Sequence, residues 1–281
     1  MIRLRLDSFR AAIEAAIRPR TMTPRKPSSV TDRAPYLDLC ARAAVDDRVF
    51  MSFRRDPILI AMFEHVTEEQ GAAYLDIIKR DSPDLLGEQF ALYRRNDKWG
   101  SPITHEYPKI GRVSPVTLRY LKIISDLELL FGDLTGKRIV EIGVGYGGQA
   151  RLVLARWRVQ SYTLVDLEPV LDLARRYLND PDIQRPLNYV PPSSVVQASY
   201  DLCISNYSFS ELDRNVQSAY AGSLVSSADR GYLICNVISQ VHGIESWSKS
   251  ELGQMHPGAH WIPEEPLTFA GNEVLVWGDA R

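Results

Sequence analysis

Residues 137–149 read Lys-Arg-Ile-Val-Glu-Ile-Gly-Val-Gly-Tyr-Gly-Gly-Gln, an apolar run that passes directly into a cluster of glycines. The run is typical of a short buried strand, and residues 149–157 after it favour a helix. Gly143, Gly145 and Gly148 fit G-x-G-x-x-G, a spacing that turns a strand tightly into a helix beside a nucleotide. Asp166 ends the next predicted strand, 23 residues after Gly143 (166 − 143), where a carboxylate can hold ribose hydroxyls. A turn that binds nothing would use the same glycines, but this combination favours a binding turn.

Strands and helices alternate downstream of the glycines. Apolar runs predict strands, and amphipathic stretches between them predict helices; the strands are 137–143, 161–166, 200–205 and 231–239, and the helices are 149–157, 169–178 and 210–228. This alternation indicates an α/β fold with a mostly parallel sheet covered on both faces. Residues 266–269 and 273–278, separated by Ala270-Gly271-Asn272, predict an antiparallel hairpin that closes the sheet.

Three regions are expected along the chain. Residues 1–35 carry eight Arg or Lys and three Asp or Glu, a net charge of +5, and predict a mobile basic N-terminal arm. Residues 36–114 begin with helix formers and predict a helical cap or lid subdomain. Residues 115–281 hold the predicted sheet, introduced by a helix at 115–131 that Ser114-Pro115 would start.

Composition excludes several classes of protein. The 281 residues carry a formal net charge of −2 and are 45% hydrophobic, which predicts a globular protein that binds neither nucleic acid nor membrane. A solvated leader explains the basic arm better than an RNA or lipid contact, since few aromatic residues interleave with its arginines. Three widely spaced cysteines argue against a zinc site or disulfide framework. A reducing, cytoplasmic setting is the resulting expectation.

Glu141 bears on which nucleoside the turn binds. A carboxylate two residues before Gly143 would repel the pyrophosphate of a dinucleotide, which such turns hold at a helix N-terminus. The same carboxylate would attract the ammonium and sulfonium groups of S-adenosylmethionine, or it could hydrogen-bond the turn's own amides. No Tyr-x-x-x-Lys pair follows the turn, as a short-chain dehydrogenase would require. S-adenosyl-L-methionine is therefore the expected cofactor, and an oxidoreductase is the less favoured reading.

The stretch RIVEIGVGYGGQ resembles the first motif of class I S-adenosylmethionine-dependent methyltransferases. Together with SPVTLRYLKII upstream and YDLCISNYSFSEL downstream, it looks like a family of sugar O-methyltransferases over about residues 101–236. The resemblance implies a Rossmann-like, seven-stranded sheet with an antiparallel last strand.

The resemblance also implies a set of cofactor-binding residues. Arg119 would pair with the cofactor carboxylate, although a surface ion pair on its helix explains it equally well. The others would line the methionine part, the ribose, the adenine and the methyl side; they are Glu141, Gly143, Gly145, Tyr146, Gly147, Asp166, Leu167, Gln197, Ser205 and Asn206.

Methyl transfer to a hydroxyl gains from a base that removes its proton. His242, just beyond the strand at 231–239, is the first candidate because histidine titrates near neutrality. Glu211, after the strand at 200–205, is the second, although an acidic residue in a first helical turn capped by Ser208 or Ser210 is the plainer explanation. No adjacent pair of aspartates follows that strand to hold Mg²⁺, so no metal is expected.

The sequence thus predicts an enzyme that methylates a hydroxyl of a sugar or glycosylated small molecule. A non-sugar acceptor is the alternative substrate, and a catalytically silent S-adenosylmethionine-binding partner subunit is the alternative role. The acceptor is expected to be a small molecule or glycan. Residues 36–95 would cover its pocket or form the surface of a homodimer.

Overall fold

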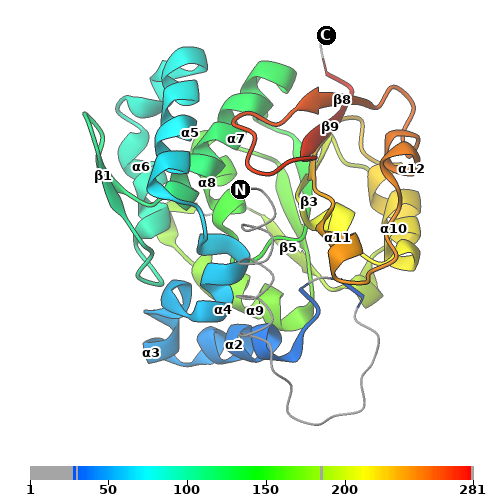
Figure 1. Cartoon of the computed structure of the whole chain (residues 1–281), viewed down its shortest axis with the longest axis horizontal. Coiled ribbons are helices and arrows are strands. Elements are labelled where there is room, and N and C mark those ends of the chain that lie inside the picture. Colours follow the sequence, from blue (N-terminus) through cyan, green and yellow to red (C-terminus); the bar gives the residue numbers. More distant parts are fainter. Residues whose placement is uncertain (1–27, 30, 184–185, 280–281) are drawn as a thin grey trace.

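A seven-stranded sheet forms the centre of the protein, with helices on both faces (Figure 1). The computed structural model describes residues 28–29, 31–183 and 186–279. The strand order is β5-β4-β3-β6-β7-β9-β8. The strands are β3 (Arg138–Ile142), β4 (Ser161–Val165), β5 (Leu187–Val190), β6 (Leu202–Asn206), β7 (Gly231–Cys235), β8 (His260–Pro263) and β9 (Glu273–Trp277). Strands β3 to β7 are parallel, whereas β9 is antiparallel to β7 and β8. This arrangement confirms the expected Rossmann-like sheet with an antiparallel last strand.

The central strands are buried on both faces, as their continuous apolar runs require. On β3, Ile139 faces a core formed with one layer of helices and Val140 faces a second core on the other side. Helices α8 (Gly148–Arg156) and α9 (Glu168–Tyr177) belong to the first side, and α10 (Arg214–Tyr220) and α12 (Lys249–Gly253) to the second. The short helix α11 (Ile238–Val241) follows β7. The carboxyl ends of the parallel strands therefore share one edge of the sheet.

Three details of the predicted elements were wrong. The strand that forms the closing hairpin with β9 is β8, with Trp261 opposite Leu275, and not residues 266–269. Those residues lie in a connection organised around the Glu264 carboxylate. Strand β5 was not predicted, because its four residues run directly into Pro191-Pro192. The helix expected at 210–228 is divided into η7 (Ser208–Glu211), α10 and η8 (Ala221–Val225). Asp213, and neither serine, caps α10.

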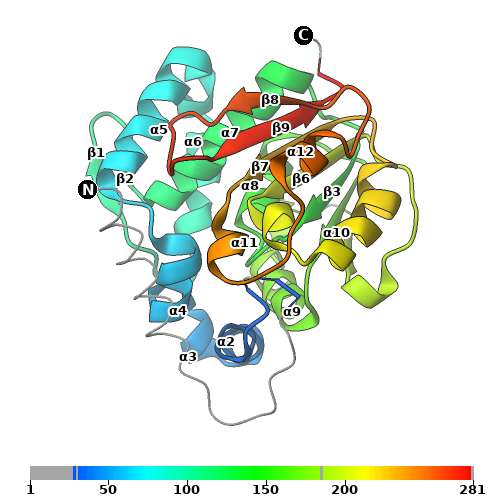
Figure 2. The ribbon, with the colours of Figure 1, turned by 45° about the vertical axis from the view of Figure 1, so that its right-hand side comes forward.

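Short helices precede the sheet and pack against it (Figure 2). They are α2 (Ala34–Val45), α3 (Asp47–Phe50), η1 (Phe53–Arg55), α4 (Pro57–Leu59), η2 (Ile60–Glu64), α5 (Glu68–Asp81), η3 (Pro83–Leu86), α6 (Phe90–Arg94) and η4 (Arg95–Asp97). A hairpin of β1 (His105–Tyr107) and β2 (Gly111–Val113) follows. Helix α2 packs on α9, and α5 packs on the helix α7 (Pro115–Phe131). These helices and one face of the sheet share a continuous core, and the boundaries 36–114 and 115–281 stay a prediction.

Helix α7 (Pro115–Phe131) matches its predicted limits. The Ser114 side chain accepts a hydrogen bond from Val116 N, and Gly132, with φ 72°, ends the helix. Most of the predicted basic arm, residues 1–27 and 30, lies outside the described residues. No helix in the described ranges is both long and apolar enough to cross a lipid bilayer.

Candidate cofactor and acceptor site

Three glycines turn the chain from β3 into α8. Gly143, Gly145 and Gly147 have φ values of 77°, 53° and 92°, a left-handed backbone that favours glycine. A Cβ on Gly143 would lie 2.0 Å from Ser208 Oγ, so Ser208 packs directly on this residue. A Cβ on Gly145 would lie 3.4 Å from the Phe63 ring. The predicted tight turn is confirmed, and two side chains of this protein lie against it.

Asp166, at the end of β4, holds this turn in place. One carboxylate oxygen accepts hydrogen bonds from Val144 N at 2.8 Å and Gly145 N at 3.2 Å, and the other accepts from Leu167 N at 2.8 Å. Burial raises the pKa of Asp166 to about 6, although these backbone hydrogen bonds oppose the shift. The carboxylate is thus ionised at neutral pH. Oδ1, which accepts only one of these bonds, retains acceptor capacity for a further donor.

Glu141 lies two residues before the turn, in a buried position that favours the protonated form of its carboxyl group. It is 1% exposed, and the Tyr162 hydroxyl donates to Glu141 Oε2 at 2.7 Å. Burial raises the pKa of Glu141 to about 8, against the lowering effect of that hydrogen bond. The protonated form therefore predominates at pH 7, and the expected attraction of a cation by an ionised Glu141 is corrected. Its neutral carboxyl group supports the turn from below.

Strand β6 ends beside β3 with two side chains of different character. Ser205 Oγ donates to Ile142 O at 2.9 Å and accepts from Phe209 N at 3.0 Å, so Ser205 joins the two strand ends. This structural link differs from the expected cofactor contact. Asn206 Oδ1 is buried and has no hydrogen-bond partner in the described part of the chain. A buried acceptor without a partner is costly, so this oxygen is a candidate contact for a ligand, as predicted for Asn206.

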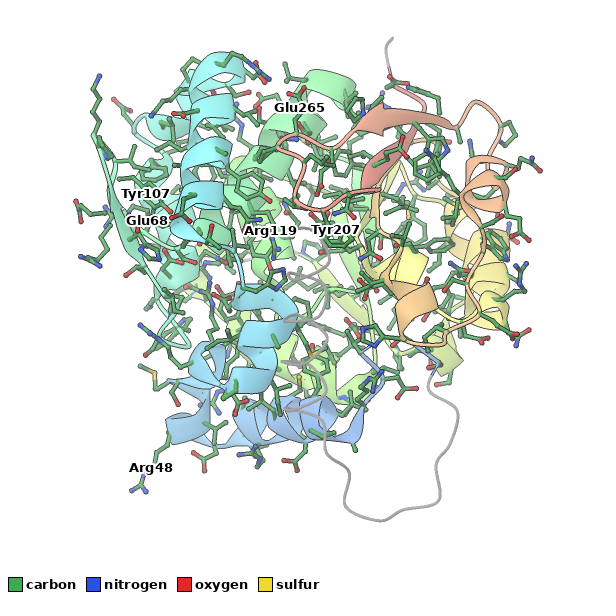
Figure 3. All side chains as sticks on the ribbon, viewed as in Figure 1. Arg48, Glu68, Tyr107, Arg119, Tyr207 and Glu265 are labelled. Atoms are coloured by element: carbon green, nitrogen blue, oxygen red, sulfur yellow. The ribbon has the colours of Figure 1, made fainter. Side chains whose placement is uncertain are left out.

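Arg119 is a buried cation above the turn. It is 8% exposed, donates to Phe63 O at 3.3 Å and lies over the Tyr120 ring at 5.4 Å. Within the ranges the structure covers, no carboxylate forms an ion pair with it, so the alternative of a surface ion pair is excluded. Since a guanidinium offers five donors, Arg119 can still bind an anionic group. Figure 3 shows Arg119 and Tyr207 in the middle of the molecule.

Tyr207, the residue after β6, has an unusual backbone. Its φ of 69° is left-handed, which is rare for a bulky side chain and common at functional sites. The phenol donates to the buried carboxylate of Glu264, which also accepts from Thr268 N at 2.9 Å. This hydrogen bond joins the end of β6 to the connection between β8 and β9. Nothing in the sequence pattern indicated this pairing, because the partners are 57 residues apart.

The Tyr146 side chain packs among the helices. It is 1% exposed, and its ring packs edge-on against Phe53 and Tyr177. The Arg54 guanidinium lies 5.0 Å from the centre of this ring. A Cβ on Gly148, the first residue of α8, would lie 2.4 Å from the Tyr120 ring and 2.8 Å from the Tyr146 ring. The two tyrosines thus pack against the first residue of α8, and a cofactor contact of Tyr146 stays a prediction.

The two predicted adenine contacts differ in position. Leu167, next to Asp166, is half-buried at the start of α9. Gln197 is exposed and lies three residues before Tyr200, which bridges Ala228 at the amino-terminal end of β6. The glycine turn and Asp166 lie at the carboxyl ends of the strands. The structure therefore brings Leu167 to this edge and leaves Gln197 outside it.

Glu211 and His242, the candidate bases, both follow strands at this edge. Asn236 Nδ2 donates to Glu211 Oε1 at 2.6 Å. Burial raises the pKa of Glu211 to about 7, although the Asn236 hydrogen bond lowers it. His242 Nδ1 is 3.4 Å from Arg33 Nη2, and since a guanidinium only donates, this nitrogen is the acceptor. The order of His242 and Glu211 as candidate bases stays a prediction.

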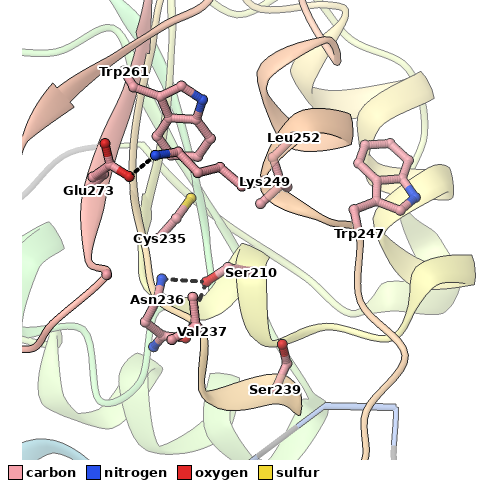
Figure 4. Close-up of a pocket in the computed structure, with 11 residues that line it drawn as sticks. Ser210, Cys235, Asn236, Val237, Ser239, Trp247, Lys249, Leu252, Trp261 and Glu273 are labelled. Atoms are coloured by element: carbon pink, nitrogen blue, oxygen red, sulfur yellow. Dashed lines mark hydrogen bonds and ion pairs between the residues drawn. The ribbon is translucent and has the colours of Figure 1, made fainter.

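A small cavity lies beside Asn236, the residue that donates to Glu211 (Figure 4). Its volume is about 40 Å³, which admits a few water molecules but no sugar ring. It is lined by Ser210, Cys235, Asn236, Val237, Ser239, Trp247, Lys249, Leu252, Trp261, Gly271 and Glu273. Metal ligands do not gather here or elsewhere: among the described residues, no group of three His, Cys, Asp or Glu could hold an ion.

Comparison with known proteins gives distant structural likenesses. No family model matches the chain, and no curated protein matches it. Magnesium protoporphyrin IX methyltransferase from Synechocystis PCC 6803, crystallised with S-adenosylmethionine, is 14% identical over 72% of this chain and 95% of its own (TM-score 0.44). An O-methyltransferase of neocarzinostatin biosynthesis is 17% identical over 57% and 56% (TM-score 0.39). Mitomycin 7-O-methyltransferase is 16% identical over 79% and 70% (TM-score 0.42).

Proposed function

We propose that this protein is an S-adenosylmethionine-dependent O-methyltransferase that methylates a hydroxyl of a sugar or glycosylated small molecule. One observation carries the proposal. The left-handed glycine turn, the Asp166 carboxylate and the unpartnered Asn206 Oδ1 converge at the carboxyl ends of β3, β4 and β6. Ligands of such sheets bind at this edge.

The residues at this edge fit the cofactor. Asp166 is ionised, and its Oδ1 can accept from a ribose hydroxyl while the carboxylate holds the turn. Leu167 offers an apolar surface to the adenine. Asn206 Oδ1 can accept from the ammonium group, and Arg119, buried without a carboxylate, can bind the amino-acid carboxylate. The ribose, the ammonium group and the carboxylate of the cofactor would thus bind Asp166, Asn206 and Arg119, respectively.

A dinucleotide fits less well. Its pyrophosphate would rest on the N-terminus of α8, but the rings of Tyr120 and Tyr146 lie against Gly148, the first residue of that helix. Both tyrosines are buried. Moving them would also disturb the Arg54 side chain, which contacts the Tyr146 ring. The covered helix end therefore supports S-adenosylmethionine over NAD.

The chain's own part in the reaction is alignment and proton removal. S-adenosylmethionine, when bound, supplies a methyl group on a cationic sulfur for in-line displacement. Glu211, with a pKa of about 7, can take the proton of the acceptor hydroxyl near neutrality. Asn236 fixes the orientation of the Glu211 carboxylate.

The acceptor class rests on the motif resemblance and on Tyr207. Tyr207 is half-buried near Arg119 and has an aromatic ring that can pack on a sugar face. This ring supports a sugar-containing acceptor.

Calorimetry with S-adenosylmethionine and with NAD tests the cofactor. We expect binding of the first and none of the second; binding of NAD alone overturns the proposal. Incubation with radiolabelled S-adenosylmethionine and a pool of glycans and glycosides then tests transfer. Tight cofactor binding without transfer to any hydroxyl acceptor would support the silent-subunit alternative instead.

A further inference from the structure

A second, larger hollow lies between α6, η4 and the β1–β2 hairpin. Its volume is about 440 Å³, within the range of small-molecule sites. Figure 2 shows the hairpin beside α6. The lining residues are Ala91, Arg94, Arg95, Asp97, Lys98, Thr104 and Arg112, none of which belongs to the glycine turn.

Four of the seven lining residues are cationic. Arg94 is the last residue of α6, Arg95 is the first residue of η4, and Lys98 directly follows η4. Arg112 comes from β2. Arg94 reaches toward the hairpin, because its Nη1 lies 3.9 Å from where a Cβ on Gly111 would be. The hollow therefore concentrates positive charge from two separate elements in a protein whose net charge is −2.

The carboxylates that the structure places near Arg94, Lys98 and Arg112 do little to balance these three charges. Asp97 turns inward, where one oxygen accepts from Ser114 N at 2.7 Å and the other from Thr117 Oγ1 at 2.7 Å. The same carboxylate lies 3.6 Å from the buried Arg54, so its charge is already compensated. Glu106 is 3.8 Å from Arg112, and both side chains are exposed, a contact worth at most about 1 kcal/mol.

Arg94 and Lys98 have no carboxylate partner in the ranges the structure covers. The Lys98 ammonium lies 4.6 Å from the centre of the Trp99 ring, which positions the charge without neutralising it. Like charges held around one hollow repel each other unless an anion joins them. Arginine forks match the oxygens of a phosphate group, and phosphates carry the charge density that several cations require.

We propose that this hollow binds a small polyanion that carries phosphate groups. The site is independent of the proposed methyl transfer, because the two share no side chain. Exposed arginines and a lysine are its main contacts, so binding weakens as ionic strength rises.

Titration of the full chain with inorganic pyrophosphate at low ionic strength, followed by calorimetry, tests the proposal. We expect saturable binding that Arg94→Ala weakens by about tenfold, the loss of roughly one good charge contact. Arg48→Ala is the matched control, since Arg48 is an exposed arginine on α3 outside the hollow (Figure 3), and it should change the affinity less than about twofold.

Two results would overturn the site. The first is the absence of pyrophosphate binding to the unaltered chain. The second is an equal loss with Arg94→Ala and Arg48→Ala, which would show only a general response to surface charge. Both side chains are exposed, so neither variant should disturb folding, and circular dichroism confirms this. Either failure leaves the cofactor titration unaffected.

Discussion

Three carboxyl groups near the strand ends, those of Asp166, Glu141 and Glu211, either hold the glycine turn or titrate near neutral pH. Asp166 ties the turn through three backbone hydrogen bonds, and Glu141 supports it from below in a form that burial keeps neutral at pH 7. Glu211 titrates near neutrality. Their pKa values of about 6, 8 and 7 differ because their partners differ. Each therefore makes a separate prediction.

Replacing Asp166 by alanine should weaken both the fold and cofactor binding. Val144 N and Gly145 N would lose their acceptor, at a cost of about 1–3 kcal/mol of unfolding free energy. Calorimetry should show at least about tenfold weaker S-adenosylmethionine binding, the loss of a charge-assisted contact. Asp172→Ala, on the exposed face of α9, is the control and should leave affinity unchanged. Unaltered affinity in Asp166→Ala contradicts the ribose assignment.

Glu141→Gln should change how stability depends on pH. The pKa of Glu141 is raised to about 8 in the folded chain, above its ordinary value of about 4.3. The folded state thus holds a proton that the unfolded state releases, and stability is lost as pH rises from about 4.3 to 8. Glutamine does not titrate, so the variant does not lose this stability. In urea unfolding, the free energy of unfolding of the variant should therefore rise relative to that of the unaltered chain between pH 5 and pH 8.5, by on the order of 1–3 kcal/mol. A difference independent of pH would contradict this.

Glu211→Gln tests the proposed base. A base works deprotonated, so kcat/KM should rise with pH through about 7, the pKa of Glu211. The variant keeps an oxygen for Asn236 but cannot take a proton, and we expect a rate loss of ~10²–10⁴ and no rising limb. Cofactor affinity should stay the same. If His242→Ala removes that limb and Glu211→Gln does not, His242 is the base.

At the scale of elements, a buried ion pair joins the helices to the glycine turn. Arg54 of η1 donates to Glu64 of η2 at 2.6 and 3.1 Å, and both residues are buried. Arg54 also donates to Asn96 O at 2.8 Å and lies over Tyr146 of the turn. Phe63, which contacts Gly145, immediately precedes Glu64. The position of η2 over the turn therefore depends on this pair.

Breaking the pair on one side should cost more than replacing it. Glu64→Leu removes the carboxylate that accepts two hydrogen bonds from Arg54 and leaves only Asp97, 3.6 Å away, to offset this buried charge. Losing one partner of a buried ion pair typically costs about 3–5 kcal/mol. The double variant Arg54→Met with Glu64→Leu removes both charges, and urea unfolding should show most of that loss recovered. Equal destabilisation by the single and double variants would show that packing, and not the charge, is responsible.

Local patterns predicted the elements that depend on local chemistry. Ser114-Pro115 and Gly132 set the limits of α7, and the glycines fixed the turn after β3. Contacts between distant segments escaped prediction. Tyr146 faces the helices because Arg54 and Phe53 lie there, and β9 pairs with β8 instead of its nearer neighbour because Glu264 organises the connection. No spacing in the sequence encodes such pairings.

At the scale of the whole molecule, the helices before α7 and the sheet form one packed unit. Tyr74 and Leu75 of α5 belong to the same core as Leu121 of α7 and Ile139 of β3. A fragment that starts at Pro115 would expose this face of α7, which is buried along nearly its whole length. We expect such a fragment to aggregate or lack a cooperative unfolding transition, as measured by size-exclusion chromatography and thermal circular dichroism. A monomeric, cooperatively folded fragment would contradict a shared core.

The position of β9 between β7 and β8 has a consequence for the order of folding during synthesis. In the described sheet β8 pairs with no strand except β9, although it leaves the ribosome earlier. Until Glu273–Trp277 leave the ribosome, the edge of β7 that pairs with β9 has unpaired backbone amide and carbonyl groups. Such an edge can associate with the strands of other chains. A nascent chain stalled before Glu273 is therefore a natural client for chaperones, whereas one extended past Trp277 can close its own sheet.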